Sequence, residues 1–202
     1  NVGALCAIDT QPRTFSDADI AILTNFAHIV TDEMELRQIA KRDHLTGALN
    51  RRGFLEQVEK EISRFVRHQR PATLIALDVD HFKAINDCHG HPAGDEVLRQ
   101  IAQLCSATMR PSDSFGRLGG EEFALLLPEI AGAEAFAATE RFRVKIESQN
   151  FAIPGDQMLR VTASFGVMAI SSDVENADAW LATTDALLYE AKRNGRNRVS
   201  TG

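Results

Sequence analysis

The sequence predicts a mixed α/β domain in which helices flank a central, mainly antiparallel sheet. Three observations support this fold class. After residues 1–40, apolar runs of strand length, such as 73–77 and 123–127, alternate with amphipathic segments of helical period. Gly119 and Gly120 mark a tight turn into the second of these runs. The first 40 residues show a different pattern and are expected to form a separate segment.

Each expected element follows from the spacing of its apolar residues or from the glycine and proline residues that bound it. The helical spacing of apolar residues predicts helices over 52–67, a short segment after His81, 95–109, 133–146 and 177–193. Apolar runs predict strands over 73–79, 159–170 and 198–200, and a hairpin over 114–129 centred on the double glycine. Glycine and proline predict a turn over 89–94. A chain of 202 residues is long enough for one full domain plus a fragment.

The N-terminal segment is expected to contain a strand over 2–8, a turn over 9–15 and a helix from about residue 17 into the low 40s. Ser16 and Asp19 form a capping box for that helix. Apolar residues spaced by three, four and four positions fit a coiled-coil seam and predict a dimerising stalk: Leu23, Phe26, Val30 and Met34. The chain opens without a signal peptide or an initiator Met, so we expect an excised piece of a longer protein.

Composition excludes several classes of protein. With 44% hydrophobic and 25% charged residues, the chain is typical of a globular protein. Its net charge of −6 leaves no basic stripe, so no nucleic-acid partner is expected. No run of 18 apolar residues exists, so no membrane span is expected in this fragment. Cys6, Cys88 and Cys105 are odd in number and far apart, which disfavours disulfides and favours a cytoplasmic location.

Acidic residues stand where the apolar runs begin or end. The first run ends in Asp78 and Asp80, and Glu121 and Glu122 stand at the entrance of the second. Adjacent carboxylates are costly to crowd together unless a cation neutralises them. Two strands that bring such groups to one edge of a sheet predict a Mg²⁺-dependent phosphoryl or nucleotidyl transfer site. Asp80 is expected to point away from Asp78. A structural role for Asp80, such as pairing with a basic neighbour, and a role in the acidic site both stay open.

Five motifs, in order along the chain, carry a resemblance to a known family. They are DHLTGALNRR at 43–52, LDVDHFK at 77–83, IND at 85–87, GGEEF at 119–123 and AKRNGRN at 191–197. Together they resemble the motifs of GGDEF domains, in the GGEEF form of the signature. Residues 1–40 are similar to the last strand and exit helix of a GAF domain. We therefore expect a truncated GAF-like tail with a stalk helix over 1–40 and a GGDEF domain over 41–202.

The resemblance implies a diguanylate cyclase, which condenses two GTP into cyclic di-GMP and two pyrophosphates. The implied fold is similar to the palm core of nucleotidyl cyclases and polymerases. The family also implies Mg²⁺, with Mn²⁺ as an alternative, held by Asp78, the Val79 carbonyl, Glu121 and Glu122. Glu121, Glu122 and Lys83 are the candidate catalytic residues. Which glutamate helps to deprotonate the attacking hydroxyl stays open.

The same resemblance assigns a nucleotide site. Its residues are Phe82, Lys83, Asn86, Asp95, Gly119, Gly120, Lys192 and Arg196. Asn86 and Asp95 would read guanine, whose edge offers donors that adenine lacks, and the alternative for Asp95 is an N-cap of the helix that follows. Backbone amides at 81–83 can cradle phosphate oxygens. The three basic residues of the set would neutralise phosphates, with solubilising surface charge as the alternative.

A further pair, Arg110 and Asp113, resembles the family's inhibitory product site for cyclic di-GMP, and Arg141 resembles a secondary product contact. The alternative for both arginines is an exposed helix-end charge. One half-site holds one GTP, so synthesis is expected to need a homodimer. Two other hypotheses stay open: a catalytically silent receptor that binds cyclic di-GMP, and a GTP-binding regulatory module for a neighbouring domain.

Overall fold

The computed structural model describes residues 14–39 and 41–202 of the chain. The chain divides into two compact units, Asn1–Lys41 and Arg42–Gly202, and each is described by itself. The strand expected over 2–8, and most of the turn expected over 9–15, lie outside the described residues. The assignment of this segment to a GAF domain therefore stays a prediction.

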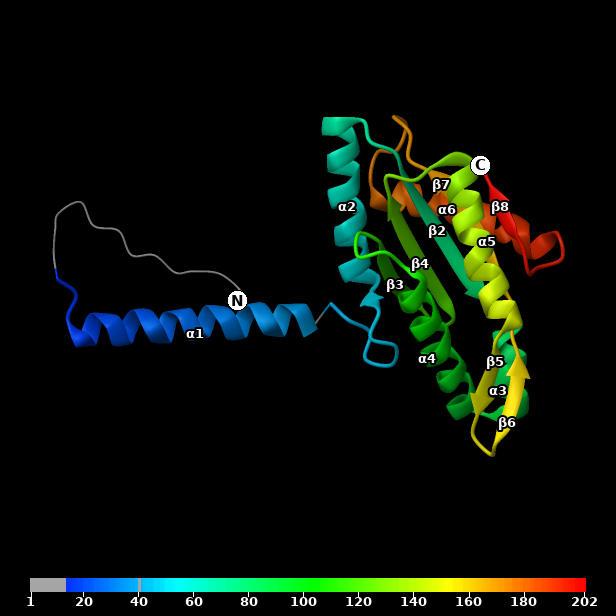
Figure 1. Cartoon of the computed structure of the whole chain (residues 1–202), viewed down its shortest axis with the longest axis horizontal. Helices are drawn as coiled ribbons and strands as arrows, with labels where there is room; N and C mark the ends of the chain where they lie inside the picture. Colours follow the sequence, from blue (N-terminus) through cyan, green and yellow to red (C-terminus); the bar gives the residue numbers. More distant parts are fainter. Residues whose placement is uncertain (1–13, 40) are drawn as a thin grey trace. The chain divides into compact units, whose positions relative to one another are not determined.

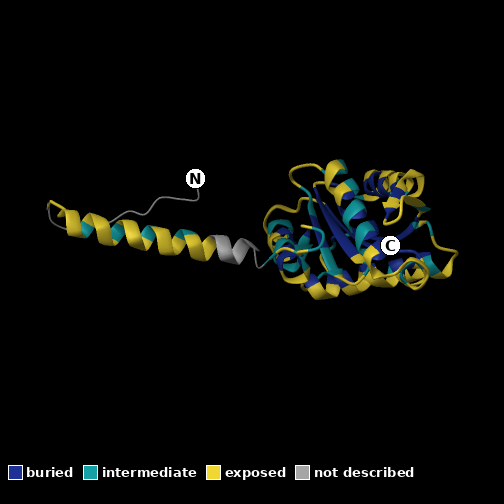
Figure 2. Ribbon diagram, turned by 90° about the horizontal axis from the view of Figure 1, so that it is seen from below, coloured by how far each residue is buried: buried dark blue, intermediate teal, exposed yellow. Residues whose placement is uncertain are grey.

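The first unit contains α1, Asp17–Ile39. Ser16 caps its start, because the Ser16 hydroxyl oxygen accepts from the Asp19 N–H at 3.2 Å and Asp19 Oδ2 accepts from the Ser16 N–H at 2.9 Å. This reciprocal pair is the capping box that the sequence predicts. Most of α1 is exposed within this unit (Figure 2). Three of the four residues of the predicted seam are among its exposed residues: Phe26, Val30 and Met34.

The second unit is an alternation of helices and strands. Its helices are α2 (Arg51–His68), α3 (Phe82–His89), α4 (His91–Thr108), α5 (Gly132–Ser148) and α6 (Ala177–Arg193). Its strands are β1 (Leu49–Asn50), β2 (Ala72–Val79), β3 (Ser114–Gly119), β4 (Glu122–Pro128), β5 (Asn150–Ile153), β6 (Gln157–Arg160), β7 (Ala163–Ala169) and β8 (Val199–Thr201).

Six of these strands form one sheet in the order β1-β3-β4-β2-β7-β8. Its central strands pair antiparallel, β3 with β4, β4 with β2 and β2 with β7. The outer strands pair parallel, β1 with β3 and β8 with β7. The sheet is mainly antiparallel, which confirms the predicted fold class. β5 and β6 form a separate antiparallel hairpin.

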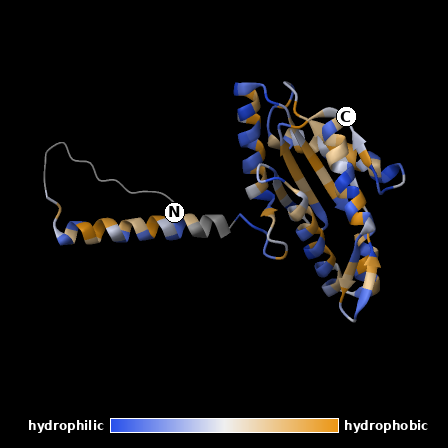
Figure 3. Cartoon of the chain, viewed as in Figure 1, coloured by the Kyte–Doolittle hydropathy of each residue, from blue (hydrophilic) through white to orange (hydrophobic). Residues whose placement is uncertain are grey.

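Helices cover both faces of the sheet (Figure 1). α4 and α5 pack on the face to which Ile75 and Leu77 of β2 point, and they form the larger core. α2 and α6 pack on the other face, with Leu74 of β2 and Leu126 of β4. All residues of β2 are buried between these layers, and the central strands are among the most hydrophobic parts of the unit (Figures 2 and 3).

The strand expected over 159–170 is wrong in its extent. The chain turns at Gly155 and Asp156, both of which have positive φ, so that β6 folds back on β5 and not into the main sheet. β7 then joins the sheet at Ala163, opposite Val79 of β2. The sequence showed one apolar stretch, whereas the structure places its first two residues in β6 of the small sheet and residues 163–169 in β7 of the main sheet.

The turn expected over 89–94 is also wrong in its extent. Gly90 alone joins α3 to α4, because its φ of 81° is a conformation that glycine adopts without steric cost. Pro92 fits the first turn of α4, where no N–H donor is needed. Within the described parts of the chain, no helix combines the length and the apolar character that a bilayer crossing requires.

Candidate active site

The end of β2 and the start of β4 lie side by side at one edge of the sheet. Asp78 of β2 is directly opposite Glu122 of β4. Opposed residues of antiparallel strands point to the same face, and on this face Lys192 Nζ of α6 lies 2.7 Å from Asp78 Oδ2. Glu121 occupies the turn between β3 and β4. The structure thus brings Asp78, Glu121 and Glu122 to one edge, as the sequence predicts.

Burial and neighbouring charges raise the pKa of Asp78 to about 6. The largest cause is desolvation, since the residue is only 6% exposed. Lys192 lowers the pKa through its hydrogen bond and its charge, whereas Glu121 and Glu122 raise it by like-charge repulsion. Lys192 therefore does not fully compensate for the desolvation of the Asp78 carboxylate and its repulsion by Glu121 and Glu122.

The chemistry of these residues fits a divalent cation. Mg²⁺ prefers carboxylate and carbonyl oxygens, and this edge offers Asp78, Glu121, Glu122 and the main chain of Val79. Within residues 14–39 and 41–202, no three potential ligand side chains surround a single point, and the cation that faces Asp78 is the Lys192 ammonium. A metal ion here would relieve the electrostatic deficit that raises the pKa of Asp78.

The double glycine leaves open space beside the carboxylates. Gly120 has a φ of 48°, and a Cβ on Gly119 or Gly120 would meet no atom within 4 Å. Arg117 fixes this turn from the side: its Nε donates to the Gly120 carbonyl at 2.9 Å, and its Nη1 lies 3.2 Å from Asp43 Oδ1. Arg117 thus ties the signature turn to the start of the unit. The sequence analysis missed this pair, which periodicity does not signal.

Asp80 does not point away from Asp78, contrary to the expectation. Residues two apart on an extended chain share a face, and Asp80 accepts from Ser164, the register partner of Asp78 in β7. Its partners are not basic either. The carboxylate accepts from the Ser164 hydroxyl at 2.7 Å, the Thr162 hydroxyl at 2.8 Å and the Asn197 N–H at 3.0 Å. Hydroxyl and amide donors replace the basic neighbour that the sequence analysis expected.

The predicted phosphate-binding groups lie near the same edge. His81, the N-cap of α3, has a φ of 57° and makes no side-chain capping bond, so the first amides of α3 have no side-chain acceptor from the cap. Lys83 is exposed in the first turn of α3. Lys192 is in the last turn of α6, and Arg196 is exposed in the turn that follows.

Asn86 and Asp95, the predicted guanine-reading residues, come together where α3 packs against α4. A Cβ on Gly94 would lie 2.0 Å from Asn86 Oδ1, so this glycine makes the room that the amide occupies. Asp95 is half-buried inside α4, whose N-cap is Gly90, and the N-cap role considered for Asp95 is wrong. Phe82 belongs to the larger core and is only 8% exposed.

Two charged residues that the sequence analysis missed, Asp185 and Arg51, act on the acidic edge. Burial raises the pKa of Asp185, Glu122 raises it further, and Arg51 and Lys192 lower it. Asp185 precedes Lys192 by two helical turns on α6. This spacing was the signal that could have placed Asp185 on the same helix face.

Arg110 and Asp113 form one turn between α4 and β3. Asp113 Oδ2 accepts from the Arg110 N–H at 2.8 Å, and the Arg110 guanidinium lies 3.8 Å from Glu134 of α5. A hollow of about 390 Å³ beside this turn has Arg42, Arg110 and Asp113 in its lining. Arg141 is exposed on α5, about 10 Å beyond Glu134 along the helix. The structure brings Arg110 and Asp113 together and places Arg141 on the adjacent helix.

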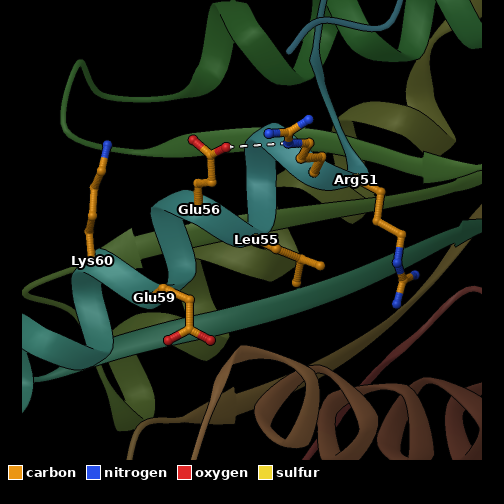
Figure 4. A pocket seen from close by; sticks show the side chains of 6 residues that line it. Arg51, Leu55, Glu56, Glu59 and Lys60 are labelled. Carbon is orange, nitrogen blue, oxygen red and sulfur yellow. Dashed lines mark ion pairs between the residues drawn. The ribbon is translucent and has the colours of Figure 1, made fainter. Parts of the chain in front are cut away.

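A second hollow, of about 660 Å³, lies along α2 (Figure 4). Leu55 lines it together with charged residues that include Glu56 and Lys60. Arg51 extends away from Glu56 and Lys60, and its guanidinium lies 3.7 Å from Asp178 of α6. None of the residues that line this hollow belongs to the predicted site, and we assign it no role.

The sheet, its flanking helices and its acidic edge define a class of protein, a domain with the palm fold of nucleotidyl cyclases. A family model described as "Diguanylate cyclase, GGDEF domain" matches residues 40–198. The chain belongs to this family, which confirms the resemblance seen in its motifs.

Individual relatives agree with this assignment. The response regulator PleD of Caulobacter vibrioides is 38% identical over 163 residues, which are 80% of this chain and 36% of PleD. The probable diguanylate cyclase DgcC of Escherichia coli K12 is 37% identical over 164 residues, 81% of this chain and 44% of DgcC. The chain thus spans less than half the length of these curated relatives.

A solved structure extends the similarity to the N-terminal segment. The coiled coil and GGDEF domain of DgcB from Caulobacter crescentus, in complex with c-di-GMP, matches with a TM-score of 0.83 and 29% identity. The match covers 92% of this chain and 98% of the DgcB chain.

Proposed function

We propose that the second unit is one half-site of a diguanylate cyclase. Two GTP molecules would condense to cyclic di-GMP and two pyrophosphates, each GTP held by one protomer of a homodimer. The observation that carries the proposal is the register pairing of Asp78 with Glu122, beside an open glycine turn and the Lys192 ammonium. Membership of the diguanylate cyclase family supports it.

The acidic edge would bind the metal and handle the proton. Asp78, Glu121, Glu122 and the Val79 carbonyl would hold Mg²⁺, or Mn²⁺ in its place. The bound metal would neutralise charge on the reacting phosphate. Glu121 or Glu122 would accept the proton of the 3′-hydroxyl, because carboxylates within hydrogen-bond reach serve as general bases.

The remaining site residues would bind and orient GTP. Asn86 and Asp95 would read the guanine edge, because an amide and a carboxylate match its donors and acceptor. The amides at the start of α3, with Lys83, would hold phosphate oxygens. Lys192 would exchange its Asp78 contact for the triphosphate when a metal ion occupies the edge, and Arg196 would add a second cation.

Dimerisation through α1 would bring two half-sites together. The seam residues Phe26, Val30 and Met34 are exposed within the first unit, and a stalk partner would cover them. The DgcB relative is described as having a coiled coil, which supports this role for α1. Light scattering across a concentration series should show a dimer wherever the specific activity is full. Full activity at the mass of one chain would contradict the dimer requirement.

One assay separates the cyclase from the two other hypotheses. The protein is incubated with GTP and Mg²⁺, and the nucleotides are separated by chromatography. We expect cyclic di-GMP with two pyrophosphates per product molecule, and no product from Glu122→Ala. Binding of cyclic di-GMP without turnover would favour the silent receptor, and binding of GTP without turnover would favour the regulatory module.

We also propose feedback by the product at the turn of Arg110 and Asp113. An arginine can bind guanine and phosphate bidentately, and the adjacent hollow of about 390 Å³ gives a ligand room. Arg141 would add a second contact from α5. Arg110→Ala should remove inhibition by cyclic di-GMP and leave the initial rate unchanged. Unchanged inhibition in this variant would contradict the assignment.

A further inference from the structure

The turn between α6 and β8 contains three consecutive residues with a left-handed backbone. Gly195, Arg196 and Asn197 have φ values of 112°, 59° and 46°. Glycine adopts such values freely, but residues with a Cβ are strained there. Strained residues of this kind persist when surrounding contacts hold them, and they gather at functional sites.

Asp80 supplies one of these contacts from the end of β2. The Asn197 N–H donates to Asp80 Oδ2 at 3.0 Å, and the Thr162 hydroxyl donates to the same oxygen at 2.8 Å. The Ser164 hydroxyl donates to Oδ1 at 2.7 Å. Asp80 is only 4% exposed, so these donors replace its water shell. Its carboxylate joins β2, β7 and the turn before β8.

α5 holds the same turn from its other side. The Asn197 Nδ2 donates to Glu147 Oε1 at 2.7 Å, and Arg143 Nη1 donates to Asn197 Oδ1 at 3.0 Å. The Arg196 N–H donates to the Ala191 carbonyl at 3.1 Å, which anchors the turn to the last part of α6. Hydrogen bonds thus tie the turn to Asp80, to α5 and to α6, while the Arg196 residue itself is exposed.

We propose that Asp80 is a positioning residue: its buried carboxylate holds the left-handed turn and so fixes Arg196 near the edge that carries Asp78. The inference rests on the proposed function, in which Arg196 binds a phosphate. Asp80 is not a metal ligand in this account, because hydroxyl and amide donors already use its oxygens. At the end of β2, Asp78 would thus help to hold the metal ion, whereas Asp80 holds the turn through the Asn197 N–H.

Two substitutions distinguish a positioning residue from a metal ligand. Asp80→Ala leaves Asn197 without its acceptor, and we expect the KM for GTP to rise about tenfold while kcat stays within about threefold. Asp80→Asn can keep the bond, because the amide oxygen can face Thr162 and Asn197 while the NH₂ donates to the Ser164 hydroxyl. We expect its KM to rise less than about threefold. The Mg²⁺ concentration for half-maximal activity should not change in either variant.

A metal ligand would behave differently. If Asp80→Asn raised the Mg²⁺ requirement about tenfold, as removal of a ligand does, the proposal would be overturned. In an Arg196→Ala background, Asp80→Ala should raise the KM little further, because the two substitutions remove one effect. Full additivity of the two KM effects would likewise contradict the proposal.

Amide hydrogen exchange tests the hydrogen bond without nucleotide or metal. The Asn197 amide should exchange about tenfold faster in Asp80→Ala than in wild type. Ser164→Ala is the matched control: it removes a donor from Oδ1 and leaves the Asn197 bond, so the Asn197 exchange rate should not change. An unchanged Asn197 rate in Asp80→Ala would overturn the proposal. Should that variant not fold, the Mg²⁺ requirement of Asp80→Asn decides alone. A wild-type protein without cyclase activity would contradict the proposed function, and the exchange result would still test the turn.

Discussion

Two turns at the same edge of the sheet contain residues with positive φ, and different contacts hold them. The signature turn joins β3 to β4 at residues 120–121, and the closing turn joins α6 to β8 at residues 194–198. In the signature turn, Gly120 adopts its φ of 48° with no side chain, and the space where a Cβ would stand is open. In the closing turn, Arg196 and Asn197 adopt similar values with their side chains present, and hydrogen bonds from Asp80 and α5 hold Asn197. The first turn keeps space for a ligand to approach the backbone, whereas the second fixes the direction of a side chain. Similar positive φ values thus occur in two turns with different roles.

Among substitutions in the two turns, the largest expected effect comes from filling the open space at Gly120. Gly120→Ala should cost about 1–2 kcal/mol of stability through its left-handed backbone, and it should lower activity about hundredfold by displacing the ligand. Gly132→Ala is the matched control, because Gly132 has a φ of 57° and equally open surroundings at the start of α5. The control should lose the same stability and keep its activity. Equal losses of activity in both variants would show that strain, not space, matters at Gly120.

Gly94 offers a third use of glycine, because a neighbouring side chain fills the place of its Cβ. Gly94→Ala should displace Asn86 and raise the KM for GTP about tenfold, with a smaller effect on ATP. The Cβ would also lie 3.0 Å from Cζ of the buried Phe82, so the melting temperature should fall slightly although alanine's better helix propensity contributes about 1 kcal/mol. In an Asn86→Ala background, Gly94→Ala should have no further effect on KM. A further tenfold rise of KM in that background would show that Gly94→Ala does not act through Asn86.

The acidic edge predicts a pH-dependent response to metal. The pKa of Asp78 is raised from 3.8 to about 6, so its contribution to folding is full below 3.8 and is lost as the pH rises through 6. Asp78→Asn should therefore raise the melting temperature at pH 8, by roughly 2–4 °C after allowance for solvent screening, and by less at pH 5. Lys192, 30% exposed, can be solvated when its partner is lost.

At pH 8, Mg²⁺ should make the wild-type protein melt at a higher temperature than Asp78→Asn, the reverse of the order expected without metal. It should stabilise the wild-type protein at pH 8 more than at pH 5, because protons compete with the metal for Asp78. Asp78→Asn should lose most of that stabilisation, which thermal denaturation with and without Mg²⁺ would measure. Equal stabilisation of both proteins at pH 8 would contradict a metal site that uses Asp78.

The smallest expected effect concerns the product turn. Glu134→Gln frees Arg110 from an exposed partner 3.8 Å away, so cyclic di-GMP should inhibit at a concentration at most about threefold lower. High salt should remove this difference, because it screens the pair in the wild-type protein. An inhibition constant that rises in Glu134→Gln would argue that Glu134 itself binds the product.

Most of the fold could be predicted because its signals are local. The apolar run over 123–127 and the helical spacing over 177–193 each fix one element, and the structure confirms both as β4 and α6. β1, which is only Leu49–Asn50, is too short to have a period. β5 was not predicted, and the last two residues of β6 were merged with β7, because apolar residues alone do not say which strand pairs with which.

The site residues that belong to a sequence motif could be predicted. The contacts between segments that are distant in sequence could not. Asp78 and Glu122 were found because each stands at the end of an apolar run. Asp80 was placed on the wrong side although residues two apart on a strand share a face. Its hydroxyl and amide partners could not be predicted, because they are 82 to 117 residues away in sequence and only the folded sheet brings them together. The pairing of Arg117 with Asp43 was missed for the same reason.

The most direct test of the account is the initial rate of cyclic di-GMP formation from GTP and Mg²⁺, compared between wild type, Glu122→Ala and Gly132→Ala. We expect product from wild type and from Gly132→Ala at similar rates, and none above background from Glu122→Ala. A dimeric wild-type protein that binds GTP and forms no product, or an active Glu122→Ala, would contradict the assignment of the chemistry to this edge.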